Sequence, residues 1–352
     1  MKAVTVPFFI SHQGCPHTCI FCDQRTVSGA PGSLPGNAEI VAKIAAWRLS
    51  AGGTPLEAAF FGGTFSALPI EVREQLLAPL QPLLASGEIT SVRISTRPDH
   101  IDADTVEWLA ERGVRTIELG VQSMDDAVLD SAGRGHDAAS SEAAIRCVKA
   151  HGLSVGAQLM SGLPGDTPSK ALRSLERVIA AGADFVRIYP VVVLAGTELA
   201  RRFAAGEYCP PGIEQGVRLC KVLLHAAMQG GVPVVRIGLQ ADRGLNADSV
   251  LAGCLHPAFG QLVRSELYFD MLCRLTSGRA GAAPLSIRCH PSRISDCIGQ
   301  GRVNLERLRQ QGVSASVRPD ASLLREEVVV DLFGRCIKGN VISDLYFNIN
   351  EV

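Results

Sequence analysis

The feature that most constrains this chain is a regular alternation of short apolar runs with helical stretches, from the N-terminus to about residue 235. The apolar runs predict strands at Ala3–Ile10, Leu56–Phe61, Ser91–Thr96, Thr116–Val121, Ser154–Met160 and Phe185–Val191. The stretches between them predict helices at Ala38–Leu49, Ile70–Ala85, Ala103–Glu111, Ala138–Lys149 and Lys170–Ala180. This alternation is typical of a parallel sheet with helices outside it, so the chain is expected to have an α/β fold, an open partial (β/α)6 barrel.

The pattern changes after about residue 240. A helix at Ile213–Gln229 and a strand at Pro233–Ile237 complete the alternating part. Residues 241–282 are expected to form loop and helix. The remaining chain predicts strands at Pro284–Cys289, Val313–Val317 and Glu327–Leu332 and a helix at Asn304–Gln310. We therefore expect one domain over residues 1–240 and a smaller α+β region over residues 241–352.

Composition restricts the class of protein. The 352 residues are 47% hydrophobic and carry a formal net charge of −1, which gives no overall attraction to nucleic acid or to a membrane. The first residues do not resemble a signal peptide, and no apolar run is long enough to span a bilayer. Eleven cysteines in such a chain are expected to be reduced thiols. The protein is thus expected to be cytoplasmic and without a membrane partner.

Three of the cysteines, Cys15, Cys19 and Cys22, lie in the loop after the first predicted strand, where a parallel barrel places its active site. Three thiolates at this spacing can bind three corners of a [4Fe–4S] cluster from one loop. The fourth iron would stay open to the amino and carboxylate groups of an amino acid. A zinc site that includes His17, or ordinary thiols, are the alternatives that the spacing leaves open.

A glycine pair follows the second predicted strand, in Gly62-Gly63-Thr64. Paired glycines let the backbone approach a ligand closely, and their exposed N–H and C=O groups can hold an ammonium and a carboxylate. Such a pair alone is usually only a turn. Its position after a cysteine triad and a first β/α unit makes it a candidate ligand site.

The sequence resembles the radical S-adenosylmethionine (SAM) superfamily, most of all the branch containing the catalytic subunit of Elongator, a tRNA-modifying enzyme. The segments that carry the resemblance span about residues 8–190 and are CPHTCIFC, FFGGTF, ISTRPD, ELGVQS, Arg134-Gly135-His136, GLPG and IYP. The resemblance implies a TIM-like partial barrel, a [4Fe–4S] cluster on the three cysteines, S-adenosyl-L-methionine as cofactor, oxygen sensitivity, and an electron donor such as flavodoxin or ferredoxin. It also implies tRNA as a candidate partner.

The resemblance further implies which residues contact SAM, and these are Phe21, Gly62, Gly63, Thr64, Ser95, Gln122, Arg134 and Gln158. Phe21 would lie against the adenine, the glycine turn would hold the methionyl amino group, and Arg134 would bind the carboxylate. Ser95 stands where many relatives have a ribose-binding glutamate, and Gln158 where several have aspartate. Some neighbouring residues have a structural alternative: Arg97 and Asp99 could simply pair, His136 could be structural, and Tyr189 could close the barrel.

The C-terminal region gives less guidance. The Elongator subunit has an acetyltransferase domain, but here the one G-x-G, Gly299-Gln300-Gly301, has Asp296 where that domain's acetyl-CoA turn has Gln or Arg, so we expect no acetyltransferase domain. Five arginines against Asp296 and Glu306 give residues 288–309 a net charge of 5 − 2 = +3, which predicts possible RNA or phosphate contacts beside the barrel mouth. These residues are Arg288, Arg293, Arg302, Arg307 and Arg309. A solvated, internally paired helix is the alternative.

A second metal site is conceivable from the cysteines and histidines of this region, which are Cys254, His256, Cys289, His290 and Cys297. Their spacings match no zinc pattern, so buried thiols and ordinary histidines are the favoured interpretation.

Three functions remain open. The favoured one is a radical SAM enzyme that modifies RNA, at a uridine of tRNA. The second is a radical SAM enzyme acting on a small molecule, because oxygen-independent coproporphyrinogen oxidase shares several of the motifs. The third is a non-catalytic relative that delivers haem.

Overall fold

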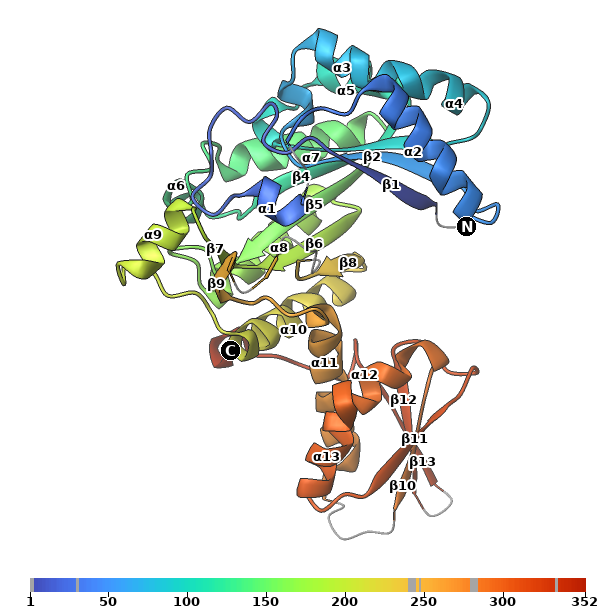
Figure 1. Ribbon diagram of the computed structural model, residues 1–352. Coiled ribbons are helices and arrows are strands. Elements are labelled where there is room, and N and C mark those ends of the chain that lie inside the picture. The colour runs from blue at the N-terminus through green and yellow to red at the C-terminus, as the bar shows by residue number, and fades with distance from the viewer. Residues whose placement is uncertain (1–2, 30–31, 240–244, 247, 279–283, 333–334) are drawn as a thin grey trace.

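The computed structural model describes residues 3–29, 32–239, 245–246, 248–278, 284–332 and 335–352. A seven-stranded sheet with the order β1-β2-β3-β4-β5-β6-β8 forms its centre (Figure 1). All neighbouring strands in it are parallel. The strands are β1 (Val4–Phe9), β2 (Leu56–Phe61), β3 (Ser91–Thr96), β4 (Val114–Gln122), β5 (Ser154–Ser161), β6 (Phe185–Pro190) and β8 (Val234–Ile237). The predicted partial barrel is therefore confirmed.

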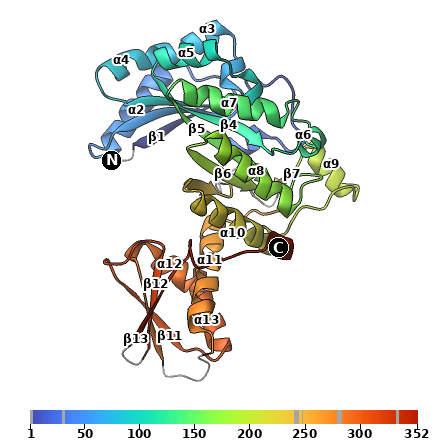
Figure 2. The same cartoon turned by 180° about the vertical axis from the view of Figure 1, so that it is seen from behind.

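Helices cover the outer face of this curled sheet, as the two opposite views show (Figures 1 and 2). They are α2 (Asn37–Ser50), α3 (Ile70–Leu77), α4 (Gln81–Ala85), α5 (Ala103–Glu111), α7 (Ala138–Ala150), α8 (Pro168–Ala181) and α10 (Ile213–Gln229). Three short helices lie where the strands end, and these are α1 (Gln24–Ser28), α6 (Asp126–Ser131) and α9 (Glu198–Ala204). The inner face and the carboxyl ends of the strands are therefore the part of the sheet that the outer helices leave uncovered.

Local sequence explains where these elements stop. Gly113, Gly152 and Gly182 follow α5, α7 and α8 with φ of +84°, +73° and +105°, the left-handed conformation expected after a helix. The prediction of a single helix over Ile70–Ala85 was wrong in one respect. The structure divides it into α3, a 3₁₀ turn at Ala78–Leu80 and α4. Pro79 and Pro82 fall at this division, and a proline has no N–H for the helical ladder.

A second unit follows the half-barrel. Helix α11 (Phe259–Thr276) leads to a four-stranded sheet of order β11-β10-β12-β13. Its elements are β10 (Leu285–Cys289), α12 (Ile294–Ile298), α13 (Val303–Gln310), β11 (Ala315–Pro319), β12 (Glu327–Leu332) and β13 (Arg335–Asn340). The sequence did not predict β13, nor the small antiparallel pair of β7 (Val192–Leu194) with β9 (Val250–Gly253). In Figure 1 the unit lies below the half-barrel and is connected to it through α11.

The last residues return from this unit to the half-barrel. His225 on α10 places Nε2 3.1 Å from the carbonyl oxygen of Ile342, and its ring meets Phe347 edge-on at 4.9 Å. The boundary expected near residue 240 falls at 240–244, outside the described residues, so the division into two domains stays a prediction. Among the helices that the structure describes, none is both long and apolar enough to cross a bilayer.

Candidate functional site

The loop that carries the three cysteines, residues 10–23, joins β1 to α1 and lies against the turn that follows β2. Gly14 has φ +71°, and a Cβ atom there would overlap the carbonyl oxygen of Thr64. The Thr64 amide donates to the carbonyl oxygen of Gln13 at 2.8 Å. Cys15 Sγ lies 3.4 Å from Thr64 Oγ1, a group that is fully buried. The first cysteine is therefore held directly on the Gly-Gly-Thr turn.

The glycine pair of this turn is needed for close approach. Gly63 has φ +59°, and a Cβ there would overlap the carbonyl oxygens of Gln13 and Ile10. Its amide donates to Gln24 Oε1 at 2.6 Å, and the same oxygen accepts the His12 amide at 2.5 Å. Gln24 thus links the cysteine loop to the turn, a role that the sequence did not indicate because nothing local distinguishes this glutamine.

The second cysteine contacts Arg134, which lies after α6. Arg134 Nη1 donates to Cys19 Sγ at 3.1 Å, Nη2 donates to the carbonyl oxygen of Gly120, and the guanidinium meets His136 Nε2 at 3.1–3.3 Å. Both Arg134 and His136 are buried. Burial, and then the charge of Arg134, lowers the pKa of His136 to about 4, so its ring is neutral and accepts from the arginine. The cation is therefore held at the cysteine loop, not on the surface.

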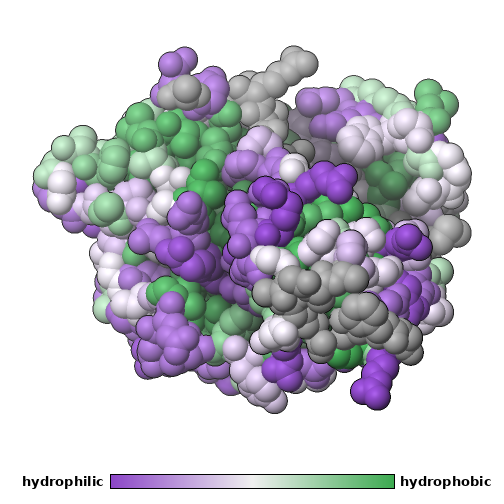
Figure 3. Space-filling view, turned by 90° about the horizontal axis from the view of Figure 1, so that it is seen from below, coloured by the Kyte–Doolittle hydropathy of each residue, from purple (hydrophilic) through white to green (hydrophobic). Residues whose placement is uncertain are grey.

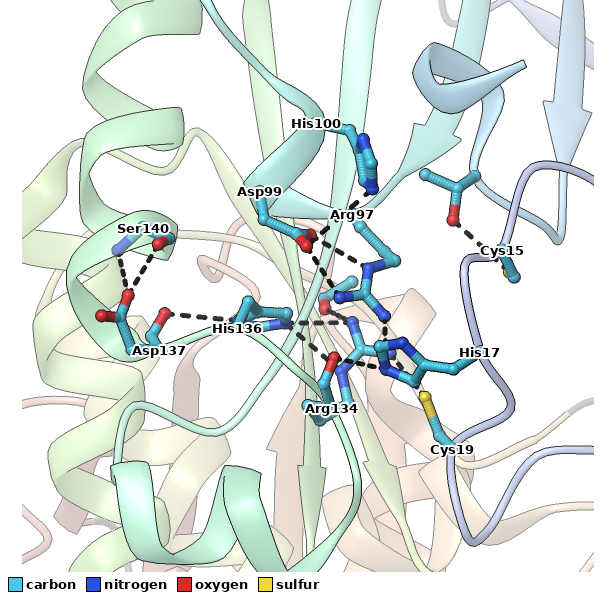
Figure 4. Close-up of polar contacts among 12 residues, drawn as sticks. Cys15, His17, Cys19, Arg97, Asp99, His100, Arg134, His136, Asp137 and Ser140 are labelled. Atoms are coloured by element: carbon cyan, nitrogen blue, oxygen red, sulfur yellow. Dashed lines mark hydrogen bonds and ion pairs between the residues drawn. The ribbon is translucent and has the colours of Figure 1, made fainter. Parts of the chain in front are cut away.

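His17, inside the same loop, is tied to the ends of two further strands (Figure 4). Its Nε2 lies 3.0 Å from both the carbonyl oxygen of Arg134 and Nη1 of Arg97. Arg97 in turn makes a bidentate ion pair with Asp99, from Nη2 to Oδ2 at 2.8 Å and from Nε to Oδ1 at 3.0 Å. The Arg97–Asp99 pairing that the sequence left as an alternative is present, and it extends through His17 to the cysteine loop.

The third cysteine, Cys22, is half-buried beside the other two thiols. Burial first, and then the neighbouring thiols of Cys19 and Cys15, raise the pKa of Cys22 to about 12, against the lowering effect of Arg134. The described residues contain no group of three or more Cys, His, Asp or Glu side chains arranged around one metal ion. Zinc needs ligands that converge on one point, whereas a cubane cluster takes each thiolate on a separate iron.

Two polar atoms near the ends of the strands are buried without a hydrogen-bond partner in the described part of the chain, Ser95 Oγ and Gln122 Oε1. Gln122 has φ +69°, which is rare for a residue with a side chain. It follows an irregularity between β4 and β5, where the register shifts between Leu119 and Gln122. Unpaired buried polar atoms and a strained backbone at one place are typical of a ligand site.

Beside these residues, a chain of charges crosses the inner face of the sheet, with Glu118 as the register partner of Ser95. Glu118 on β4 is fully buried and pairs with Arg93 on β3 and Arg187 on β6, each at 2.7 Å. Arg93 also pairs with Glu57 on β2 at 2.8 Å. Gln158 on β5 donates from Nε2 to Glu118 Oε2 at 3.0 Å. This cluster of Glu57, Arg93, Glu118 and Arg187, called here the charged floor, was not recognised from the sequence.

Comparison with known families agrees with this geometry. Residues 9–178 match the Radical SAM superfamily, and residues 183–268 match the Radical_SAM C-terminal domain. The chain belongs to the radical SAM superfamily. It is a radical SAM enzyme, and membership implies SAM and a [4Fe–4S] cluster as the cofactors of the family.

Individual relatives of this radical SAM chain point to different substrates. A tRNA uridine(34) acetyltransferase of Methanocaldococcus jannaschii is 26% identical over 73% of this chain and 54% of its own length. The heme chaperone HemW of Bacillus subtilis is 24% identical over 66% of this chain and 62% of its own. The structure of an N-terminally deleted archaeal Elp3 from Methanocaldococcus infernus has a TM-score of 0.61 at 22% identity, over 77% of this chain and 63% of that one, and so shares the fold. The chain spans about half the length of the tRNA-modifying relatives it matches.

Two further residues were singled out near the loop end of the barrel: Phe21 as a SAM contact, and Tyr189 as a substrate contact or a barrel-closing aromatic. Phe21 is half-buried and packs on an apolar cluster that includes Ile20, Met160 and Leu163. Tyr189 is buried enough that its pKa is raised, although the charge of Arg187 lowers it. The roles expected for both stay predictions.

The five C-terminal arginines lie elsewhere. The expectation that they flank the barrel mouth was wrong, because α12 and α13 belong to the unit beyond α11 in both views (Figures 1 and 2). Four of the five pair with acidic side chains: Arg288 with Asp320 and Asp331, Arg293 with Asp296, Arg307 with Glu266, and Arg309 with Glu306. Arg302 is exposed and makes no ion pair with the described residues. On the molecule's underside, hydrophilic residues gather in the middle of the view, next to hydrophobic patches (Figure 3).

The candidate ligands of a second metal site have other partners. Cys254, Cys289 and Cys297 are buried thiols. Cys254 Sγ lies 3.3 Å from the carbonyl oxygen of Pro211, and His290 Nδ1 lies 2.8 Å from Ser292 Oγ. These side chains have protein contacts that account for their placement.

Proposed function

We propose that this radical SAM enzyme holds a [4Fe–4S] cluster on Cys15, Cys19 and Cys22 and uses SAM to modify RNA, at a uridine of tRNA. One observation carries the cofactor assignment: Cys15 lies on Thr64, in the turn after β2, and Cys19 lies on Arg134, in the loop after α6. Two of the thiols are thus held by contacts with two separate loops of the half-barrel. If the cysteine loop were held only by its own turns, its thiols would not need these contacts with residues distant in sequence.

The residues around the thiols fit a cluster. Three thiolates bring three negative charges into a buried site, and the Arg134 guanidinium, 3.1 Å from Cys19 Sγ, offsets part of that charge. Neutral His136 and the Gly120 carbonyl hold the guanidinium in place. When bound, the cluster and SAM supply the chemistry of the family, the one-electron cleavage of SAM to methionine and a 5′-deoxyadenosyl radical.

The residues above the charged floor fit SAM. The glycine turn after β2 lies directly against the cysteine loop, because a Cβ at Gly63 would overlap the carbonyl oxygens of Gln13 and Ile10. Ser95 Oγ and Gln122 Oε1 are buried polar atoms without partners among the described residues, and a ligand with hydroxyl and amino groups would satisfy them. Arg134 would bind the SAM carboxylate through the second hydrogen of Nη1, the nitrogen that also donates to Cys19, in a single charge-assisted hydrogen bond.

The cofactor proposal is tested on protein purified without oxygen. We expect brown protein that releases 5′-deoxyadenosine when given SAM and dithionite. Changing Cys15, Cys19 and Cys22 together to Ala should remove both the iron and the product. Normal iron content in that triple variant would overturn the cluster assignment.

The RNA proposal is supported by the likeness to a tRNA uridine(34) acetyltransferase across nearly three quarters of this chain. The test is mass spectrometry of tRNA nucleosides from a deletion strain and its parent, where we expect a modified uridine to disappear. Binding of tRNA should also weaken with salt, with log affinity falling by roughly 0.7 per phosphate contact on a single strand for each unit of log salt.

A small-molecule or haem-related role is the second candidate, and the likeness to a heme chaperone favours it. Unchanged tRNA nucleosides, together with co-purified haem or porphyrin, would replace the RNA proposal by this one. The cluster and SAM assignment would stand in either case.

A further inference from the structure

The charged floor adjoins the expected SAM site, because its central residue, Glu118, is the register partner of Ser95 and contacts Gln158. This carboxylate has no exposed surface. Burial alone would raise its pKa, but the charges and hydrogen bonds of Arg187 and Arg93 outweigh burial and hold the pKa of Glu118 below its usual range. The side chain is therefore ionised at neutral pH and offers only hydrogen-bond acceptors.

Gln158 is the neutral neighbour of this carboxylate. It lies on β5 with Arg187 as its register partner on β6, and its amide contacts Glu118 Oε2 at 3.0 Å. An ionised carboxylate can accept but not donate, so the amide atom that faces it must be the NH₂ group. The geometry leaves one arrangement of this amide: Nε2 toward the floor and Oε1 on the opposite side.

The amide oxygen is open to the barrel interior. Gln158 is half-buried, its one hydrogen bond in the described part of the chain is the one from Nε2, and Oε1 is not among the fully buried atoms that lack partners. Gln158 is on the same inner face as Ser95, the register neighbour of Glu118, and one strand away from Gln122. Three polar oxygens without hydrogen-bond partners among the described residues therefore occur on β3, β4 and β5.

We infer that Glu118 is a positioning residue: it fixes the Gln158 amide so that Oε1 accepts a hydrogen bond from an N–H or O–H group of SAM. Without the carboxylate, the amide could turn over and present its NH₂ group, which these donors cannot use. This inference rests on the proposed function, because it requires SAM to bind in this barrel. It goes beyond that function by assigning Glu118 a part in cofactor recognition.

The test measures the SAM dissociation constant by anaerobic equilibrium dialysis with the cluster-loaded full chain. Gln158→Met keeps the size of the side chain and removes the acceptor, so SAM should bind about threefold to tenfold more weakly, the net effect of one hydrogen bond. Glu118→Gln should weaken SAM by a similar or smaller factor. The double variant should bind no worse than Gln158→Met alone, because both changes remove the same contact.

Glu57→Gln is the matched control. Glu57 is also buried and also pairs with Arg93, but its partners do not include Gln158. It should leave SAM affinity unchanged. If Glu57→Gln weakens SAM as much as Glu118→Gln, the effect comes from lost charge in the floor, and the inference fails.

A second variant covers the case in which Glu118→Gln does not fold. Glu118→Asp keeps the charge for the two arginines but withdraws the carboxylate from Gln158, and it should also weaken SAM. If the wild type binds SAM normally and either Glu118→Asp or Gln158→Met leaves SAM affinity unchanged, the inference is overturned but the proposed function is not. Failure of the wild type to bind SAM would instead overturn the proposed function.

Discussion

The half-barrel and the C-terminal unit use charged residues in opposite ways. In the half-barrel, Glu118 on β4 is fully buried and shared by two arginines, one from β3 and one from β6. In the C-terminal unit, Arg309 and Glu306 lie on one helix with 71% and 49% of their side chains exposed. Buried pairs are strongly destabilising to break, whereas exposed pairs contribute little. The buried charges are thus part of a fixed site, and the exposed arginines can exchange a carboxylate for a phosphate at small cost.

The largest expected effect comes from a pair of glycines, one in each region. Gly63 has φ +59° and Gly301 has φ +60°, so alanine is strained at both. Only at Gly63 would the new Cβ overlap other backbone, whereas Gly301 has nothing within 4 Å. Gly63→Ala should lose its iron and be about 1–3 kcal/mol less stable than Gly301→Ala, the cost of overpacking.

Iron analysis gives the iron content of the two variants, and denaturant unfolding gives their free energies of unfolding. Equal iron content in both variants would mean that the cysteine loop does not depend on its contact with the turn after β2.

A smaller effect is expected at Arg134. Arg134→Ala removes a charge-assisted contact to the SAM carboxylate, worth about 1.5–3 kcal/mol, so SAM should bind roughly tenfold to a hundredfold more weakly by anaerobic calorimetry. Iron should be retained because the three cysteines remain. Arg288→Ala, which removes an arginine from the C-terminal unit, is the control and should not change SAM binding. Loss of iron instead would show that Arg134 supports Cys19 and not SAM.

A pH effect should distinguish the buried histidine of the half-barrel. The folded-state pKa of His136, about 4, lies below the usual value of 6.5. The unfolded chain therefore takes up a proton first as the pH falls, so stability is full above pH 6.5 and is lost between pH 6.5 and about 4. Over this pH range the free energy of unfolding of His136→Gln should fall by about 1–2 kcal/mol less than that of the wild type, as measured by urea unfolding of cluster-free protein.

His290→Gln, in the C-terminal unit, is the matched control for this measurement. The pH profile of that variant should follow the wild type. A His136→Gln profile that also follows the wild type would contradict a neutral, buried His136.

The smallest effect concerns RNA. Arg302 has no ion-pair partner among the described residues, whereas Arg309 pairs with Glu306. If the C-terminal unit binds phosphate, Arg302→Ala should reduce the salt slope of tRNA binding by about 0.7, and Arg309→Ala by less. Changing Arg302, Arg307 and Arg309 together should flatten the slope further without affecting SAM cleavage. An unchanged slope in the triple variant would remove this unit from the RNA site.

The sequence predicted the half-barrel well because its signal is local. Buried strands such as Leu56–Phe61 are continuous apolar runs between helices, and this strand and Ser91–Thr96 were predicted with their observed bounds. The C-terminal unit was predicted less well because β13, with the sequence RCIKGN, has no apolar run that would mark it as a strand. The β7–β9 pair, which precedes this unit, was missed because its strands have only three and four residues and lie far apart in sequence.

The same distinction applies within the site. The spacing of the cysteines and the glycine pair can be read from the chain itself. Gln24 and the charged floor cannot, because their importance depends on contacts across the sheet. One signal was available for Glu118, a charged residue in the middle of a predicted buried strand.

The return of the last residues to α10 has a mechanical consequence. The C-terminal unit is attached to the half-barrel twice, once through α11, which contacts α10, and once through Ile342 and Phe347 on His225. A body fastened at a single point can swing, whereas one fastened at two points can rotate only about the line between them. The small unit therefore has fewer ways to move against the half-barrel than a single connection would leave it.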